Sequence, residues 1–258
     1  MMSRFKILLI GAIPPPYIGP SLANFNLIRS QLLNKHFHII HFDTSDTRNS
    51  NNIGNFDIGN AWLAIRHIYQ FIILLWRSQP DLIYLSISQG LWGIIRDLGF
   101  IIPSILTKRK VIIHLRGSEF DCVYQSLPIV IKQVTRWALK RISAAIVLGK
   151  SLTYIFEGLV PQDKIHVIPN GIDPLPYKPD RPYEQRKGIL FLATLKKRKG
   201  IFEFLYALPE VLKKHPEIKI TIAGAWRNES EELAAQNLIT ELSISHAINF
   251  VGEVSGHN

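Results

Sequence analysis

Apolar runs typical of strands alternate with segments of helical periodicity along the 258 residues of the chain. Phe5–Gly11 and Lys110–Leu115 are mostly apolar, as strands in the middle of a parallel sheet are. Between these runs, apolar residues recur every three or four positions over residues 21–34, which predicts a helix. Repetition of this alternation predicts an α/β fold in which βα units build parallel sheets.

The same pattern continues beyond this helix. Strands are expected over residues 37–42, 81–87 and 144–149, and helices over residues 61–78, 91–106 and 128–141. Pro103 is expected to bend or end the second of these helices. Residues 43–60 are rich in Ser, Asn, Thr and Gly, which predicts a long surface loop. Four prolines between Pro174 and Pro182 exclude a helix or central strand there and predict an extended linker.

These elements predict two domains, 1–173 and 188–258, joined by a proline-rich linker over 174–187. The second domain reads strand, helix, strand, helix, strand, and its last strand is expected over Ala247–Gly252. An open parallel sheet needs several strands, with helices on both faces, before its apolar surfaces are covered. We therefore expect a complete first domain and a partial second one, so that either the native chain is longer or a partner covers the second sheet.

Composition narrows the class of protein. With 47% hydrophobic and 19% charged residues the chain can bury a large core, and disorder is excluded. The single cysteine, Cys122, excludes an internal disulfide framework and suits a reducing cytoplasm. No segment reaches the roughly 18 uninterrupted apolar residues of a spanning helix. The nearest one, Ile68–Trp76, lies between two arginines and predicts a buried or interfacial helix.

The net charge of +10 indicates an anionic partner, which could be a nucleotide phosphate, a nucleic acid or an acidic lipid. No aromatic interleaving or helix-turn-helix pattern supports nucleic-acid binding. The densest basic cluster joins Arg186 and Lys187 with Lys196–Lys199 around one predicted strand. A solvated loop surface is an equally good interpretation of this cluster when composition alone is considered.

Ligands of open α/β sheets bind beyond the carboxyl ends of the strands. The first loop there, Ala12–Pro20, places Gly19 near a helix start, where backbone amides can approach an anion. It lacks the spacing of dinucleotide binders, so an ordinary turn remains an alternative. After the strand Lys110–Leu115, alternation sends His114 and Arg116 to the same side, and Glu119 follows in the next turn.

Two further loops fall at the same kind of edge. Asn170 and Gly171 are expected to form a tight turn at the end of a strand. A turn with a purely structural role would have the same two residues, so this motif alone does not indicate a binding site. In the sequence LKKRKG, Lys199 directly precedes a predicted helix, so its ammonium could meet a phosphate where the helix amides also point.

In this order, these loops resemble the retaining GT-B glycosyltransferases of family 4, also described as glycosyl transferases group 1. The resemblance covers nearly the whole chain and is carried chiefly by IIHLRGSEF (residues 112–120), VIPNGID (167–173) and ILFLATLKKRKGIFEFLYAL (189–208). It implies a GT-B-like α/β architecture with a complete N-terminal Rossmann-like domain on the acceptor side. The second Rossmann-like domain, which binds the nucleotide sugar, would be partial.

The chain also departs from the family pattern. The family has two glycines in its first loop, whereas here Gly19 is followed by Pro20. It has an arginine near the position of Thr194, and its histidine stands directly before the glycine, where this chain has Arg116. The paired glutamates of the family, which hold the donor, fall beyond the last strand of this sequence. The resemblance therefore implies that the chain as given lacks essential donor-binding residues.

The resemblance implies transfer of a sugar from a nucleotide-sugar donor to a glycan or lipid-linked acceptor, with retention of anomeric configuration and without a cofactor or metal. Its implied sites are catalytic His114 and Arg116, donor-phosphate residues Gly19, Lys199 and Thr194, and cleft residues Asn170, Gly171 and Glu119. A cytoplasmic location is expected, with peripheral contact at the inner face of the plasma membrane allowed. The alternatives are a non-catalytic remnant of such an enzyme and a basic nucleic-acid-binding protein.

Overall fold

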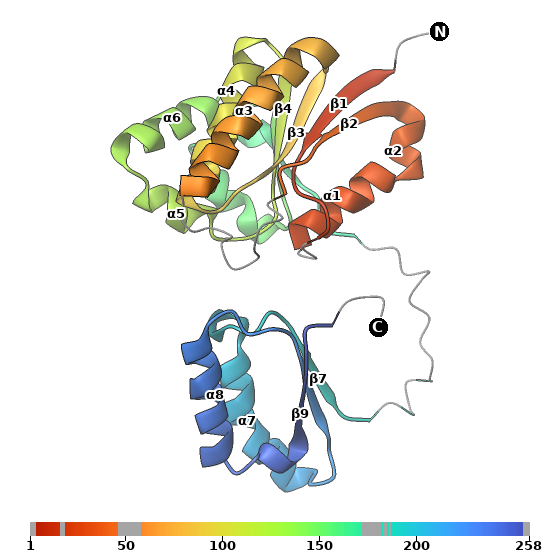
Figure 1. Ribbon diagram of the computed structural model, residues 1–258, viewed down its shortest axis with the longest axis vertical. Coiled ribbons are helices and arrows are strands. Elements are labelled where there is room, and N and C mark those ends of the chain that lie inside the picture. The colour runs from red at the N-terminus through yellow and green to blue at the C-terminus, as the bar shows by residue number, and fades with distance from the viewer. Residues whose placement is uncertain are drawn as a thin grey trace. The chain divides into compact units, whose positions relative to one another are not determined.

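The computed structural model describes residues 4–15, 19–45, 58–171, 182, 185 and 187–254. It divides into two compact units, Met1–Ile172 and Asp173–Asn258, each built on a parallel sheet (Figure 1). Most of the expected linker, 174–187, lies outside the described residues, as does much of the expected loop over 43–60.

The first unit is organised around a six-stranded sheet in the order β2-β1-β3-β4-β5-β6, with all pairs parallel. Its strands are β1 (Phe5–Ile10), β2 (Phe37–Phe42), β3 (Leu82–Ile87), β4 (Lys110–Leu115), β5 (Ala144–Val147) and β6 (Ile165–Val167). The apolar run of β1 lies between β2 and β3, and Leu8 pairs with Ile40 on one side and Ile83 on the other. The expected α/β class with a parallel sheet is thereby confirmed.

Helices and short 3-10 turns connect these strands. They are α1 (Gly19–Arg29), α2 (Gln31–His36), α3 (Ile58–Ser78), α4 (Leu91–Leu106), α5 (Phe120–Ser126), α6 (Ile129–Leu139), η2 (Lys150–Phe156) and η3 (Gln162–Lys164). The single helix expected over 21–34 is wrong, because Ser30 interrupts it. The Ser30 hydroxyl accepts a hydrogen bond from Leu33 N at 3.3 Å and so caps a second helix. Pro103 does not end α4, which continues to Leu106.

Aromatic rings fill the core between the sheet and the helices that follow β2 and β3. Phe71 of α3 and Phe100 of α4 are fully buried, and their ring centroids lie 5.1 Å apart in a T-shaped arrangement. Phe42, at the end of β2, contacts both rings edge to face. Such contacts fix α3 and α4 against the sheet, since aromatic pairs stabilise beyond the area that they bury.

The second unit has a three-stranded parallel sheet in the order β7-β8-β9. Its elements are β7 (Ile189–Leu192), η5 (Lys197–Lys199), α7 (Ile201–Lys214), β8 (Ile220–Ala223), α8 (Glu229–Glu241), η6 (Ser245–Ala247) and β9 (Ile248–Gly252). Figure 1 shows α7 and α8 side by side along the sheet, and their buried residues share one core with Ile220 and Ile222 of β8. Leu190 and Leu192 of β7 remain exposed, so one face of this sheet is uncovered within the described residues.

Candidate functional site

The carboxyl edge of the first sheet carries a row of polar side chains. Because every strand pair is parallel, β1, β3, β4 and β6 all end at this edge. Ser86 of β3 pairs in register with His114 of β4, and Tyr84 lies two residues before Ser86. Two residues apart on a strand means the same face of the sheet. Tyr84 and Ser86 therefore lie on one face, beside the strand that carries His114.

A chain of hydrogen bonds links the candidate residues at this edge. Arg116 Nη1 donates to Asn170 Oδ1 at 2.7 Å, and Arg116 Nη2 donates to Tyr84 Oη at 2.9 Å. Tyr84 Oη in turn lies 2.6 Å from His114 Nδ1. The structure thus brings His114, Arg116 and Asn170 together through Tyr84. Sequence reasoning missed Tyr84, although its place in the strand PDLIYL, one strand away from His114, was a usable signal.

Burial and charge keep His114 neutral. The pKa of His114 is lowered from 6.5 to about 4, first by burial and then by the Arg116 guanidinium. Burial raises the pKa of Tyr84, with Arg116 and Ser86 opposing that rise, so the phenol stays protonated. Since a guanidinium only donates, Tyr84 Oη accepts from Arg116 and its own hydrogen is available for His114 Nδ1.

That arrangement assigns the proton of neutral His114 to Nε2. His114 Nε2 is buried and has no hydrogen-bond partner within the described residues. A buried donor without an acceptor costs about 1–3 kcal/mol. A ligand oxygen would remove that cost only if neighbouring side chains moved aside, because the nitrogen is not exposed at the surface of this edge.

The loop after β1 is tied to the same edge through Asn24 of α1. Asn24 is buried, its Oδ1 accepts from Ser86 Oγ at 2.9 Å, and its Nδ2 donates to Ala12 O at 3.1 Å. A side chain at Gly11 would collide with the Asn24 amide, so the close approach requires glycine there. Gly19 begins α1 in open surroundings, and among the described residues no hydrogen bond joins it to His114 or Arg116.

The loop after β4 is held by the side chain of Gln89, which lies two residues after the end of β3. Gln89 Oε1 accepts a hydrogen bond from Glu119 N at 2.8 Å, and a side chain at Gly117 would collide with Gln89. Glu119 is exposed and precedes α5. Gly171 is likewise exposed beside Asn170. These contacts fix the backbone around Arg116 rather than its guanidinium.

In the second unit, the loops after β7 and β8 run side by side. Leu195 forms a parallel bridge with Trp226, and Leu195 N donates to Ala225 O at 3.0 Å. Gly224 has a φ of 146° and packs directly on the Ala193 carbonyl, which only glycine permits. Thr194 lies exposed between these contacts.

Three basic residues of this unit, Lys197, Arg198 and Lys199, form η5. Lys197 N donates to Glu231 Oε2 at 2.9 Å, which anchors the turn to the start of α8. Gly200 takes a left-handed φ of 82° and leads directly into α7. Lys199 is exposed and lies two residues before the first residue of α7, a helix of 14 residues. The backbone amides at the amino end of a helix favour a bound anion.

A groove of about 220 Å³ lies at the carboxyl edge of the second sheet. It is lined by Gly224, Trp226, Glu232, Gln236, Phe250 and Gly252. Glu232 and Gln236 are four residues apart on α8, so they share a face of that helix. Sequence reasoning placed the strands that border this groove but did not single out its lining residues. Among the described residues, no three His, Cys, Asp or Glu side chains gather as metal ligands would.

Several solved structures of other proteins have a fold similar to that of this chain. A structure of HepE from Anabaena in complex with UDP and glucose matches with a TM-score of 0.65 and 16% identity, covering 98% of this chain and 70% of that one. A glycosyltransferase from Rickettsia africae gives a TM-score of 0.62 and 16% identity, covering 98% and 69%. The chain has the GT-B fold. A UDP-GlcNAc 2-epimerase from Neisseria meningitidis is also similar, with a TM-score of 0.58 at 14% identity over 97% and 73%.

Sequence comparison adds a more specific likeness for the second unit. Residues 178–258 match the sequence model of the family described as Glycosyl transferases group 1. A protein of Methanocaldococcus jannaschii described as an uncharacterized glycosyltransferase is 32% identical over an alignment of 111 positions that covers 37% of this chain. The matched region spans only about a quarter of that relative, 27% of its length.

Proposed function

We propose that this protein is a glycosyltransferase that moves a sugar from a nucleotide-sugar donor to a glycan or lipid-linked acceptor. The observation that carries the proposal is the match of residues 178–258 to the glycosyl transferases group 1 family, in the unit that bears Lys199. The GT-B fold and the UDP present in the HepE structure support a nucleotide donor. Family-4 membership, a hexose as the transferred sugar and retention of configuration belong to the same proposal and rest on the sequence resemblance.

The second unit is proposed to bind the donor diphosphate. Negative charge grows on the leaving nucleoside diphosphate during transfer, and preorganised cations and amides stabilise it without reorganising. Lys199 and the first amides of α7 offer both kinds of group at one place. The groove beside Trp226 offers a flat ring and two polar side chains for the remainder of a nucleotide. No metal or cofactor is part of this proposal.

The first unit is proposed to act on the sugar. His114 has a neutral Nε2–H donor that is buried in this structure, and we propose that it binds a sugar hydroxyl once neighbouring side chains move aside, without adding a charge that would repel the Arg116 guanidinium. Arg116 is oriented by Tyr84 and Asn170, so its guanidinium is available in a fixed position. We propose His114 and Arg116 as the catalytic residues, with Gly19 and Thr194 contributing donor-phosphate contacts. Asn170, Gly171 and Glu119 are proposed to line the cleft.

A nucleotide-sugar epimerase is the second candidate, since an enzyme of that class has a similar fold. The family match of the second unit favours transfer over epimerisation. Product analysis separates the two: a full-length version of the enzyme, carrying the paired glutamates that the resemblance implies, is incubated with a panel of UDP-, GDP- and ADP-sugars, with and without glycan and lipid-linked acceptors. Transfer predicts release of nucleoside diphosphate that depends on an acceptor. Interconversion of nucleotide sugars without an acceptor would instead establish the epimerase, and salt-sensitive binding of random DNA alone would refute both.

A further inference from the structure

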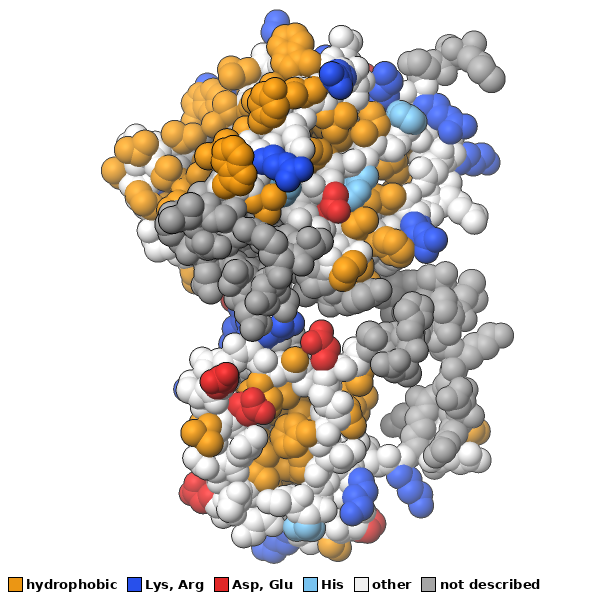
Figure 2. All heavy atoms as spheres, in the orientation of Figure 1, with side chains coloured by type: hydrophobic (Ala, Val, Ile, Leu, Met, Phe, Trp, Pro, Cys, Tyr) orange, Lys and Arg blue, Asp and Glu red, His pale blue; other side chains and the backbone are white. Residues whose placement is uncertain are grey.

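The outward face of α3 is apolar and aromatic where a water-facing helix is ordinarily polar. Trp62, Ile65, Tyr69 and Trp76 are each 59–69% exposed. At 100° per residue these four fall within one arc of about 60° on the helix. The opposite side of α3 buries Phe71 and Leu75 in the core. The helix therefore has an apolar stripe on both sides, and Figure 2 shows hydrophobic side chains gathered over this part of the first unit. Such exposed patches mark interaction sites.

Positive charge borders the exposed stripe. Arg66 and Arg77 are exposed and lie beside it on the same helix, and the sequence of α3 contains no Asp or Glu. The only acidic residue of neighbouring α4 is Asp97, which is buried and paired with Arg96 at 2.8 Å. Within the described residues, the stripe therefore combines aromatic rings with two arginines that have no exposed acidic neighbour on α3 or α4.

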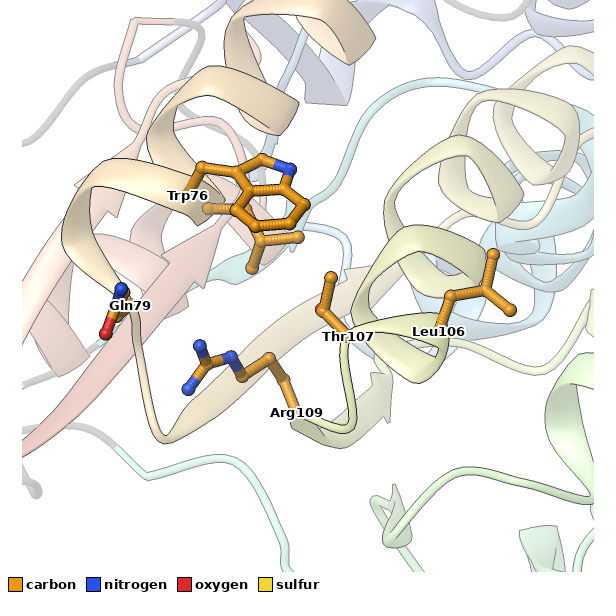
Figure 3. A pocket seen from close by; sticks show the side chains of 6 residues that line it. Trp76, Gln79, Leu106, Thr107 and Arg109 are labelled. Atoms are coloured by element: carbon orange, nitrogen blue, oxygen red, sulfur yellow. The ribbon is translucent and has the colours of Figure 1, made fainter.

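A groove of about 440 Å³ continues the stripe between the carboxyl ends of α3 and α4 (Figure 3). Trp76 belongs to both the stripe and the groove, and Leu106, at the end of α4, is exposed at its rim. Arg109 reaches into the groove from the segment before β4, and its Nε is buried without a partner among the described residues. A guanidinium in a groove beside exposed apolar side chains suits an anionic group attached to a hydrocarbon chain, which its terminal nitrogens would contact.

We propose that this surface, formed by the stripe on α3 and the groove at Arg109, docks on an anionic phospholipid bilayer. The helix lies in the plane of the interface, with its aromatic side chains at the level of the headgroups and its arginines facing lipid phosphates. Trp and Tyr suit this boundary because each joins an apolar ring to a polar tip. Among the described helices none is long and apolar enough to cross a membrane. Docking does not depend on the proposed transfer activity.

Vesicle sedimentation tests the proposal with the full chain. Vesicles of phosphatidylcholine alone are compared with vesicles that contain 30% phosphatidylglycerol. We expect strong partitioning only to the anionic vesicles, lost at high salt, because each basic residue near such a surface contributes about a fivefold gain. Millimolar glycerol phosphate or inorganic phosphate should not compete, which separates a bilayer from a free phosphate as the ligand.

Matched variants locate the surface. Tyr69→Ala should weaken partitioning several-fold, whereas Tyr206→Ala, on α7 with a nearly equal exposure of 63% against 66%, should leave it unchanged. Arg66→Gln with Arg77→Gln should weaken it far more than Lys213→Gln with Lys214→Gln, which removes the same charge elsewhere. Trp62→Ala with Trp76→Ala should abolish it while circular dichroism stays unchanged. Equal binding to both vesicle types, equal effects of each matched pair, or dimerisation that the tryptophan variants abolish would overturn the proposal.

Discussion

The carboxyl edges of the two sheets hold their candidate residues in different ways. In the first unit, His114 and Tyr84 project from paired strands, and Arg116 follows directly after β4, so that side chains bond to one another. In the second unit, Lys199 lies on an exposed 3-10 turn that is anchored in part by a hydrogen bond from the Lys197 backbone N–H to the Glu231 carboxylate. Strand-borne groups are positioned before any ligand arrives, whereas the lysine on the turn can adjust to its ligand. The first arrangement suits orientation of a sugar and the second suits neutralisation of a phosphate.

The largest expected difference between the units is in their stability to local opening. The first sheet has six strands, whereas the second has three and leaves Leu190 and Leu192 exposed. We expect amides of Phe5–Ile10 and Val111–Leu115 to exchange about 10³-fold more slowly than those of Ile218–Ala223, because fewer buried contacts must open in the second sheet. Hydrogen exchange followed by mass spectrometry measures this. Uniform protection across both sheets would contradict the expectation.

A change at Lys199 should have the next largest effect. In a full-length version of the enzyme, Lys199→Ala is expected to lower kcat for sugar transfer by roughly 10²-fold, since it removes a cation from the growing diphosphate charge. Lys214→Ala removes the same charge at the other end of α7 and should change kcat less than twofold. Arg186, another member of the basic cluster that the sequence shows, lies outside the described residues. If both lysine variants lost equally little kcat, the basic turn would be an ordinary solvated surface with no role in binding phosphate.

Tyr84→Phe should have a smaller but more diagnostic effect. It removes the hydroxyl that joins Arg116 to His114, and we expect about a tenfold loss of kcat together with a loss of stability of about 1–3 kcal/mol, because buried polar groups lose their partner. The phenylalanine leaves His114 Nδ1 without its donor, so the ring loses the preference for the Nε2–H tautomer. Nitrogen-15 shifts of labelled histidine report the tautomer directly. A purely structural role for Tyr84 would leave those shifts unchanged.

The first unit should also show a dependence of stability on pH, which the second unit should not share. The folded pKa of His114, about 4, lies below its usual value of 6.5, so the unfolded chain takes up this proton first as the pH falls. The contribution of His114 to stability is therefore full above about pH 6.5 and is lost progressively towards pH 4. His114→Asn should flatten this part of the pH profile of the urea midpoint, monitored by fluorescence of the tryptophans. An unchanged slope in that variant would show that other groups cause it.

Particular residues show how far the sequence leads. Apolar runs located nearly every strand, because buried parallel strands need little beyond continuous apolar side chains. Local capping was harder to foresee: Ser30 divides one expected helix in two through a hydrogen bond that hydrophobic periodicity does not register. Alternation along the strand predicted that His114 and Arg116 lie on one side of the sheet. The hydrogen bonds that connect them to Tyr84 depend on the register between β3 and β4, which the sequence does not show. The groove beside Trp226 depends on how α8 packs along β9, which a single sequence does not specify.

Calorimetric titration of nucleoside diphosphates and nucleotide sugars into the purified chain tests the central claim, that the second unit binds the donor diphosphate through Lys199. We predict saturable one-to-one binding of one nucleotide class that persists in 200 mM salt, is weakened at least tenfold by Lys199→Ala, and is unchanged by Lys214→Ala. Absence of saturable binding for every nucleotide, or equal affinities for the two lysine variants, would contradict it.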